Sequence, residues 1–111
     1  MIIIITSQTK DLDSQPNPQF GRTPYFIKYD LESDEWEALE NPAQKEPGGA
    51  GIAAAQFVID NNAKAVVSGR FGPNAHDVLR TAGVELLTFD ANCTSIKQVI
   101  KSYKEGSLTK G

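Results

Sequence analysis

The sequence predicts a three-layer α/β domain, in which helices cover both faces of a central sheet. Residues 2–5 form a continuous run of isoleucines, which is typical of a strand that is buried on both faces. In the second half of the chain, apolar runs of strand length alternate with apolar residues at helical spacing. Helical crossovers between successive strands require those strands to be parallel, with the helices layered on the sheet.

The first half of the chain is expected to supply three strands. Residues 2–5 should form the central strand, whereas residues 9–22 are polar, contain two prolines and a glycine, and predict a long loop that is functional or mobile. Residues 25–30 and 35–40 predict two further strands, which the turn at residues 31–34 joins into a hairpin.

The second half predicts three helices that alternate with two strands. The expected elements are a helix that contains Ile52, Ala55 and Ile59 and ends near Asn61, a strand at 65–67, a helix at 73–82, a strand at 84–89 and a helix from near Thr94 to Gly106. In the first of these helices, Ile52 belongs to the apolar stripe that should face the sheet.

Length and composition narrow the class of protein. A chain of 111 residues supports one domain, expected to span residues 1–111, and its net charge of −3 argues against binding to nucleic acid. The isoleucine run is too short for a membrane span and lacks the basic leader of a signal peptide. The single cysteine, Cys93, excludes an internal disulfide, so a cytoplasmic location is the default expectation.

Five sequence blocks together resemble the dinitrogenase iron-molybdenum cofactor family, over nearly the whole chain. They are residues 20–26 (FGRTPYF), 29–30 (YD), 48–52 (GGAGI), 69–75 (GRFGPNA) and 103–108 (YKEGSL). The resemblance implies a ribonuclease H-like fold with a five-stranded mixed sheet of order 3-2-1-4-5, in which strand 2 is antiparallel. It also implies a role in the carriage or insertion of nitrogenase-type metal clusters.

Three loops should converge at the carboxyl edge of the parallel strands, where open α/β sheets bind ligands. Two of them lead into helix starts, whose free N–H groups suit an anion. The candidate ligand-binding residues are Phe20, Gly21, Arg22, Gly48, Gly49, Gly51, Gly69 and Arg70. The glycines equally fit turns and close helix–sheet contacts, the arginines a solvated surface, and the phenylalanine core packing.

Two residues are candidate metal ligands. His76 falls in the first turn of a predicted helix, where the helix dipole favours a neutral ring, and Cys93 follows the last long strand as a soft thiolate donor. The alternatives are an ordinary surface or capping histidine and an inert buried thiol. Relatives often carry cysteine where this chain has Thr23, and one Cys plus one His cannot replace the roughly four cysteines of an iron–sulfur site.

The acidic stretch at residues 30–37 lacks the ligand spacing of a calcium loop and is interpreted as a solvated hairpin. Within it, Trp36 either covers one face of the sheet or belongs to a surface for a protein partner.

These features predict a non-enzymatic protein that binds or carries an iron-molybdenum or iron–sulfur type cluster, or its precursor. The cluster should not be permanently bound, and no structural metal is expected. The expected partners are the cluster or a small anion and a cluster-donor or cluster-acceptor protein, with the chain a monomer or weak homodimer. The alternative is a small protein-interaction or nucleotide- or anion-sensing module, although no Walker lysine follows residues 48–51. An enzyme is not expected, because residues 2–5 offer no carboxylate for a nuclease metal pair.

Overall fold

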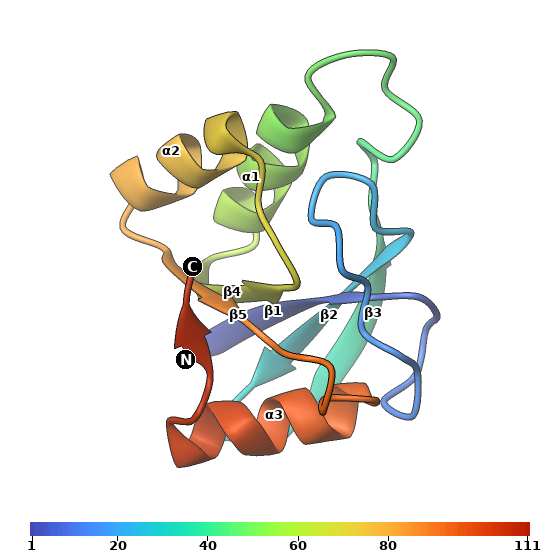
Figure 1. Ribbon diagram of the computed structural model, residues 1–111, viewed down its shortest axis with the longest axis vertical. Helices are drawn as coiled ribbons and strands as arrows, with labels where there is room; N and C mark the ends of the chain where they lie inside the picture. The colour runs from blue at the N-terminus through green and yellow to red at the C-terminus, as the bar shows by residue number, and fades with distance from the viewer.

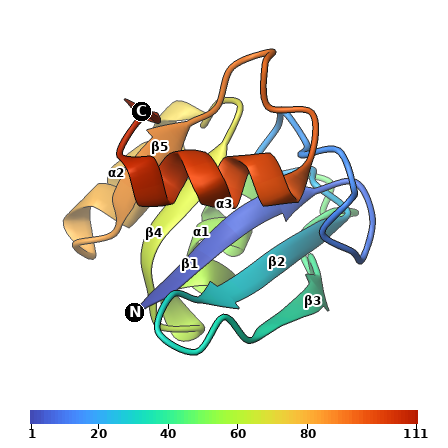
Figure 2. The same ribbon diagram turned by 90° about the horizontal axis from the view of Figure 1, so that it is seen from below.

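All strands of the computed structural model, which describes residues 1–111, belong to one mixed sheet in the order β3-β2-β1-β4-β5-β6. The elements are β1 (Ile2–Ser7), β2 (Tyr25–Asp30), β3 (Trp36–Glu40), α1 (Ala50–Asp60), β4 (Ala63–Ser68), α2 (Pro73–Thr81), β5 (Glu85–Thr88), α3 (Ile96–Glu105) and β6 (Thr109–Lys110). Helices α1 and α2 cover one face of the sheet and α3 covers the other, as Figures 1 and 2 show. The predicted three layers are confirmed.

The pairing of the strands gives four of them a common direction. β2 is antiparallel to β1 and to β3, β4 is parallel to β1 and to β5, and β6 is antiparallel to β5. The predicted order 3-2-1-4-5 is therefore confirmed, but the predicted number of five strands is wrong. The sixth strand has only two residues, which is too short for an apolar alternation to be visible in the sequence.

Strand β1 lies in the middle of the sheet, as its isoleucine run predicts. The side chains of Ile3, Ile4 and Ile5 are all 0 % exposed. Ile4 packs in the cluster under α1 and α2, whereas Ile3 and Ile5 pack in the cluster under α3. Because successive side chains of a strand point to opposite faces, a strand buried on both faces needs apolar residues at every position.

Helix α1 contacts its neighbours through a different face from the one predicted. Ile52 is 46 % exposed, so the expectation that it faces the sheet is wrong. The buried positions are instead Ala50, Ala54, Ala55 and Val58. Three of these are alanines, which allow a helix to approach its neighbours closely, and Ile52 lies on the opposite side of the helix. None of the three helices combines the length and the apolar character that a membrane span requires.

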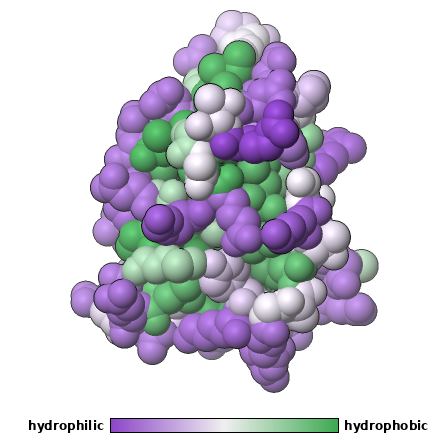
Figure 3. Space-filling view, turned by 90° about the vertical axis from the view of Figure 1, so that its left-hand side faces the viewer, coloured by the Kyte–Doolittle hydropathy of each residue, from purple (hydrophilic) through white to green (hydrophobic).

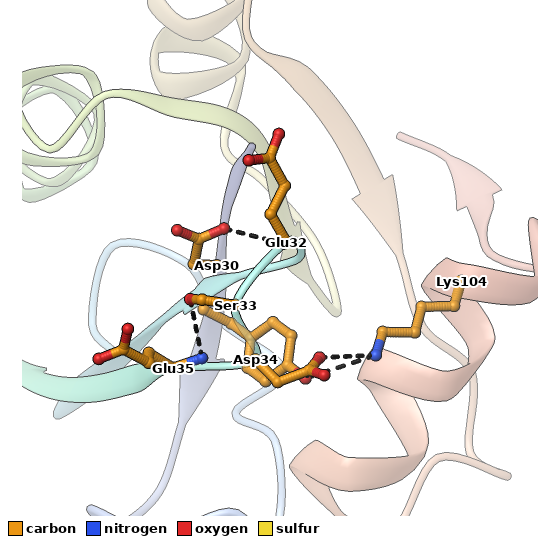
Figure 4. A network of polar contacts seen from close by, with 7 residues as sticks. Asp30, Glu32, Ser33, Asp34, Glu35 and Lys104 are labelled. Atoms are coloured by element: carbon orange, nitrogen blue, oxygen red, sulfur yellow. Dashed lines mark hydrogen bonds and ion pairs between the residues drawn. The ribbon is translucent and has the colours of Figure 1, made fainter.

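A three-residue polar cluster ties the β2–β3 hairpin to the last turn of α3 (Figure 4). The hydroxyl of Tyr29 donates to Asp34, and the Lys104 ammonium lies 3.0 Å from Asp34 Oδ1 and 5.4 Å from the centre of the Tyr29 ring. Hydrogen bonds from Tyr29 and Lys104 lower the pKa of Asp34. The hydrogen bond to Asp34 raises the pKa of Lys104 and, with burial, that of Tyr29.

Replacing Ile4 by Ala should lower the free energy of unfolding by about 2–5 kcal/mol, because it leaves a cavity in the core. Urea unfolding monitored by circular dichroism measures the loss. The matched control is Ile52→Ala, which removes the same atoms from an exposed site and should change stability by less than about 0.5 kcal/mol. Equal losses for the two variants would contradict the burial of β1.

The Asp34 cluster should stabilise the fold at neutral pH and lose its effect in acid. Because the folded-state pKa of Asp34 is lowered from 3.8, its contribution is present above pH 3.8 and is lost as the pH falls through the folded value. The stability difference between the wild type and Asp34→Asn should therefore shrink below about pH 4 in urea titrations. Asp77→Asn, an exposed acid without an ion pair, controls for the loss of one charge. A difference for Asp34→Asn that stayed constant from pH 7 to pH 3 would show that the ionisation of Asp34 contributes nothing to stability.

Candidate functional site

The candidate site lies at the carboxyl edge of β1, β3, β4 and β5 (Figure 1). The connections that follow these strands, residues 8–24, 41–49, 69–72 and 89–95, start from this edge because the four strands share one direction. The convergence follows from topology alone. It brings together segments that are up to about 70 residues apart in sequence.

Buried hydroxyl groups anchor the long loop after β1 to the end of the sheet. Thr6 Oγ1 donates to the carbonyl of Asn17 at 2.6 Å and lies 3.2 Å from Ser68 Oγ on the neighbouring strand. Thr6, Ser7 and Ser68 are 0 % exposed. Hydroxyls buried in this way need partners, so their bonds fix the path of the loop over the sheet edge.

Thr23 is also an anchor of this loop. Its side chain is 0 % exposed, and its Oγ1 accepts a hydrogen bond from the N–H of Ser7 at 3.1 Å and lies 2.9 Å from the carbonyl of Tyr25. The side chain at position 23 therefore points into the fold, toward the end of β1. In this chain the position serves to hold the loop.

Two neighbouring cavities open at the sheet edge. The first, of about 330 Å³, is lined by Gln19, Phe20, Gly21, Arg22, Ala50, Gly51, Arg70, Phe71 and Gly72. The second, of about 400 Å³, is lined by Pro18, Gln19, Gly69, Arg70, Phe89, Asp90, Ala91 and Cys93. Gln19 and Arg70 border both, and a backbone bridge joins these two residues. We call the pair the edge cavities.

Most of the predicted binding residues line the edge cavities. Phe20, Gly21, Arg22, Gly51 and Arg70 line the first, and Gly69, Arg70 and Cys93 line the second. The remaining three, Gly48, Gly49 and His76, line neither. No sequence signal marks Gln19, whereas Gly72 lies in the block at residues 69–75, and the Gly72-Pro73 pair signals a helix start.

Close backbone contacts account for two of the glycines. A Cβ atom added to Gly21 would lie 3.2 Å from the backbone of Gly51, and one added to Gly69 would lie 2.6 Å from Cα of Pro18. Gly49 differs, since it has open space around it but a φ of 72°. It is therefore required by backbone conformation and not by crowding.

The two predicted arginines are in different states. Nη1 of Arg22 donates to the carbonyls of Gln44 (2.9 Å) and Glu46 (2.6 Å), so it holds the loop after β3. The guanidinium of Arg70 is exposed and makes no hydrogen bond or ion pair within the protein. Arg70 is thus the cation of the edge cavities that is free to meet a ligand.

The first cavity also meets two helix starts that have no side-chain cap. Helix α1 follows Gly49 and α2 follows Gly72, and neither residue can offer a side-chain acceptor. The first-turn N–H groups of Gly51 and Asn74 have no acceptor in the protein. Helix α3 shows the usual solution, since Ser95 accepts from the N–H of Gln98 at 3.2 Å. Free N–H groups and positive helix ends together form an anion-binding environment.

The two candidate metal ligands contact different parts of the protein. Cys93 is half-buried at the second cavity, with Sγ 3.9 Å from Ser102 Oγ, whereas Nε2 of His76 lies 3.2 Å from the carbonyl of Gly111. No group of three or more His, Cys, Asp or Glu side chains is placed to hold a metal ion. The edge cavities therefore contain hydrogen-bond donors and a cationic side chain, and lack the set of ligands that a metal site requires.

Comparison with known proteins identifies similar sequences and structures. A sequence model of the family described as dinitrogenase iron-molybdenum cofactor matches residues 1–106. An uncharacterized protein of Methanocaldococcus jannaschii is 32% identical over 97 residues, covering 85% of this chain and 80% of that protein.

Two solved structures share the fold closely. The apo form of the orange protein from Desulfovibrio gigas aligns with a TM-score of 0.93 at 27% identity, covering 99% of this chain and 92% of that one. A Thermotoga protein of the DUF35 family, solved by NMR, aligns with a TM-score of 0.85 at 30% identity, covering 98% and 91%. The fold is thus shared with these proteins.

Removal of metal should leave the fold intact, because the core is apolar and no group of ligands holds a structural ion. We expect the same urea midpoint before and after dialysis against EDTA. Zinc-dependent unfolding of a zinc-finger peptide under the same treatment serves as the positive control. A lower midpoint after EDTA would reveal a structural metal.

Proposed function

Since this chain belongs to the dinitrogenase iron-molybdenum cofactor family, we propose that it binds or carries a preassembled, anionic metal–sulfur cluster, or a precursor of one, without catalysing a reaction. The observation that carries this proposal is the meeting of two uncapped helix starts and the unpaired guanidinium of Arg70 at one cavity. Each of these features attracts negative charge.

The charge of the first cavity favours an anion over a metal ion, whereas the second cavity also has the Asp90 carboxylate in its lining. Free N–H groups and a guanidinium are donors, and they repel a bare cation while binding sulfide or oxygen atoms that carry negative charge. A cluster with bridging sulfides presents such atoms on its outer surface. Cavities of about 330 and 400 Å³ are large enough for a small cluster, with Arg70 between them.

The scarcity of metal ligands favours a cluster that is assembled before it binds. Cys93 is the only thiol at the edge cavities, and an iron–sulfur cluster built on a protein usually needs about four. One thiolate can add a single bond to a cluster held mainly by hydrogen bonds. Binding of this kind is reversible, which suits a carrier.

The absence of a catalytic group in the first cavity supports a binding role. Its lining consists of glycine, alanine, phenylalanine, glutamine and two arginines, none of which is a general base near neutral pH. The same hydrogen-bond donors would also bind an inorganic oxyanion. The binding experiment therefore includes phosphate as a competitor.

The experiment mixes the metal-free protein with extracted iron-molybdenum cofactor or its precursor under anaerobic conditions, followed by gel filtration and metal analysis. We expect the cluster to elute with the wild type. Phosphate at millimolar concentration should displace little of it, because a cluster contacts both cavities. If no cluster elutes with the wild type, the cluster proposal fails, and binding of phosphate alone would favour an anion-sensing role.

Replacing Arg70 by Ala should weaken cluster binding by about 1.5–3 kcal/mol, because the variant loses a charge-assisted hydrogen bond. Its stability should stay near the wild-type value, because the guanidinium has no partner in the protein. Arg80→Ala, which removes an exposed arginine from the last turn of α2, is the control. Equal retention by the two variants would exclude Arg70 from the site.

Replacing Gly72 by Asp gives a second test, in which stability and binding should change in opposite directions. The new carboxylate can cap the first turn of α2, which stabilises by a few tenths of a kcal/mol, and it places a negative charge at the cavity. Gly72→Ala is the matched control, since a Cβ there meets nothing within 4 Å. If Gly72→Asp retained the cluster as well as Gly72→Ala, the helix start would not contact the ligand.

A further inference from the structure

The β2–β3 hairpin carries a concentrated negative charge that the edge cavities do not use. Residues 30–40 contain six of the fourteen acidic residues of the chain and none of its eleven basic residues. Asp34 is paired with Lys104, and Asp30 and Glu32 lie 3.7 Å from the amino group of Met1. Glu35, Glu37 and Glu40 have no ion pair, and all three belong to or adjoin β3.

Strand β3 forms an open edge of the sheet, as Figure 2 shows. It pairs with β2 on one side only, and all five of its residues are at least partly exposed. The N–H of Asp30 bonds to the carbonyl of Glu35, and the N–H of Asn41 bonds to that of Pro24. In an antiparallel pair the bonded positions alternate, so Glu37 and Leu39 face β2.

The same alternation directs the backbone of Trp36, Ala38 and Glu40 outward. Their N–H and C=O groups point to the open side, where no strand lies. The other edge of the sheet, β6, has only two residues, and Figure 3 shows that the hydrophobic surface on that side of the molecule is interrupted by polar residues. β3 is thus the longer of the two edges open to a further strand.

We propose that β3 binds an extended, basic segment of a partner protein, which adds to the sheet as a further strand. Main-chain hydrogen bonds from Trp36, Ala38 and Glu40 would hold the segment. The faces of β3 specify the side chains of the bound segment, since Trp36 and Ala38 share one face, which ends in Glu40, and Glu35 and Glu37 share the other, which ends in Leu39. A segment that alternates apolar and basic residues matches both faces.

The acidic side chains also select against a second copy of this chain. Two β3 edges placed together would bring like charges into opposition, which is one way in which proteins prevent edge-to-edge association. The same charges attract a basic strand and speed its encounter. Trp36 is 40 % exposed at this edge, and burial of its ring against an apolar residue would add to the affinity.

Trp36 is the only tryptophan of the chain, so its fluorescence reports on β3 directly. The probe is an acetylated, amidated octapeptide of alternating lysine and valine, titrated into ¹⁵N-labelled protein and into unlabelled protein for fluorescence. We expect a shift of Trp36 emission and changes of amide resonances concentrated at residues 35–41. An octapeptide of alternating glutamate and valine should not bind.

Two variants test the backbone and the charge separately. Ala38→Pro removes an outward N–H without affecting the β2 ladder, and Glu35→Gln/Glu37→Gln/Glu40→Gln removes the unpaired charges. Each should weaken peptide binding roughly tenfold or more. The control Asp77→Asn/Glu85→Gln/Glu105→Gln removes the same charge elsewhere and should bind within about twofold of the wild type.

Three results would overturn the proposal. They are an unchanged Trp36 emission and unchanged β3 amides in the presence of the peptide, wild-type affinity in the triple glutamine variant, and equal weakening by the two triple variants. If Ala38→Pro fails to fold, the triple glutamine variant and the amide shifts of the wild type still test the proposal, because neither measurement uses the proline variant. Cluster retention by the glutamine variant, measured as above, separates this surface from the edge cavities.

Discussion

The burial of β1 on both faces is the constraint on which the rest of the structure depends. A strand with no polar face cannot lie at an edge or face water, so it requires sheet partners on both sides and helices above and below. The antiparallel hairpin supplies one side, and β4, reached through α1, supplies the other. The crossover starts from β3, which has the direction of β1, so β4 is parallel to β1; β5 follows through α2, and the carboxyl ends of these strands meet at one edge. The edge cavities exist because of this central strand.

Close backbone contacts then determine which chemical groups line the edge cavities. Gly21 approaches the first turn of α1, and Gly69 approaches Pro18 in the loop after β1, too closely for a side chain to intervene. The lining is therefore rich in backbone N–H groups and poor in ligating side chains. Such a lining recognises charge and shape, which is the property needed to hold and release an assembled anion.

The sequence was informative where one physical requirement dominated a segment. The isoleucine run identified the central strand, and strand direction alone predicted which loops would converge, so five of the predicted binding residues do line the first cavity. The sequence was uninformative where several residues fit a pattern equally well and only the tertiary structure determines which of them makes the contact. Ile52 fits an apolar stripe, but three alanines of α1 make the contact instead, and β6 is too short to leave a pattern. Nothing local distinguishes Arg22, which binds two loop carbonyls, from Arg70, which binds none.

The distribution of charge explains how a protein with a net negative charge can bind an anion. With six acids and no bases in residues 30–40, the rest of the chain carries eleven bases and eight acids, and so has a net positive charge. Exposed charges act over about a Debye length, roughly 8 Å at physiological salt, so an anion at the edge cavities responds to the charges beside it more than to the total of −3. With six acids on the hairpin, Asp90 is the one carboxylate that lines the edge cavities and opposes the field of Arg70 and of the two helix starts. The hairpin also places unpaired carboxylates along the one long open strand edge, where they attract a basic partner and repel a second copy. A single chain of 111 residues can therefore present an anion site and an acidic docking edge without either cancelling the other.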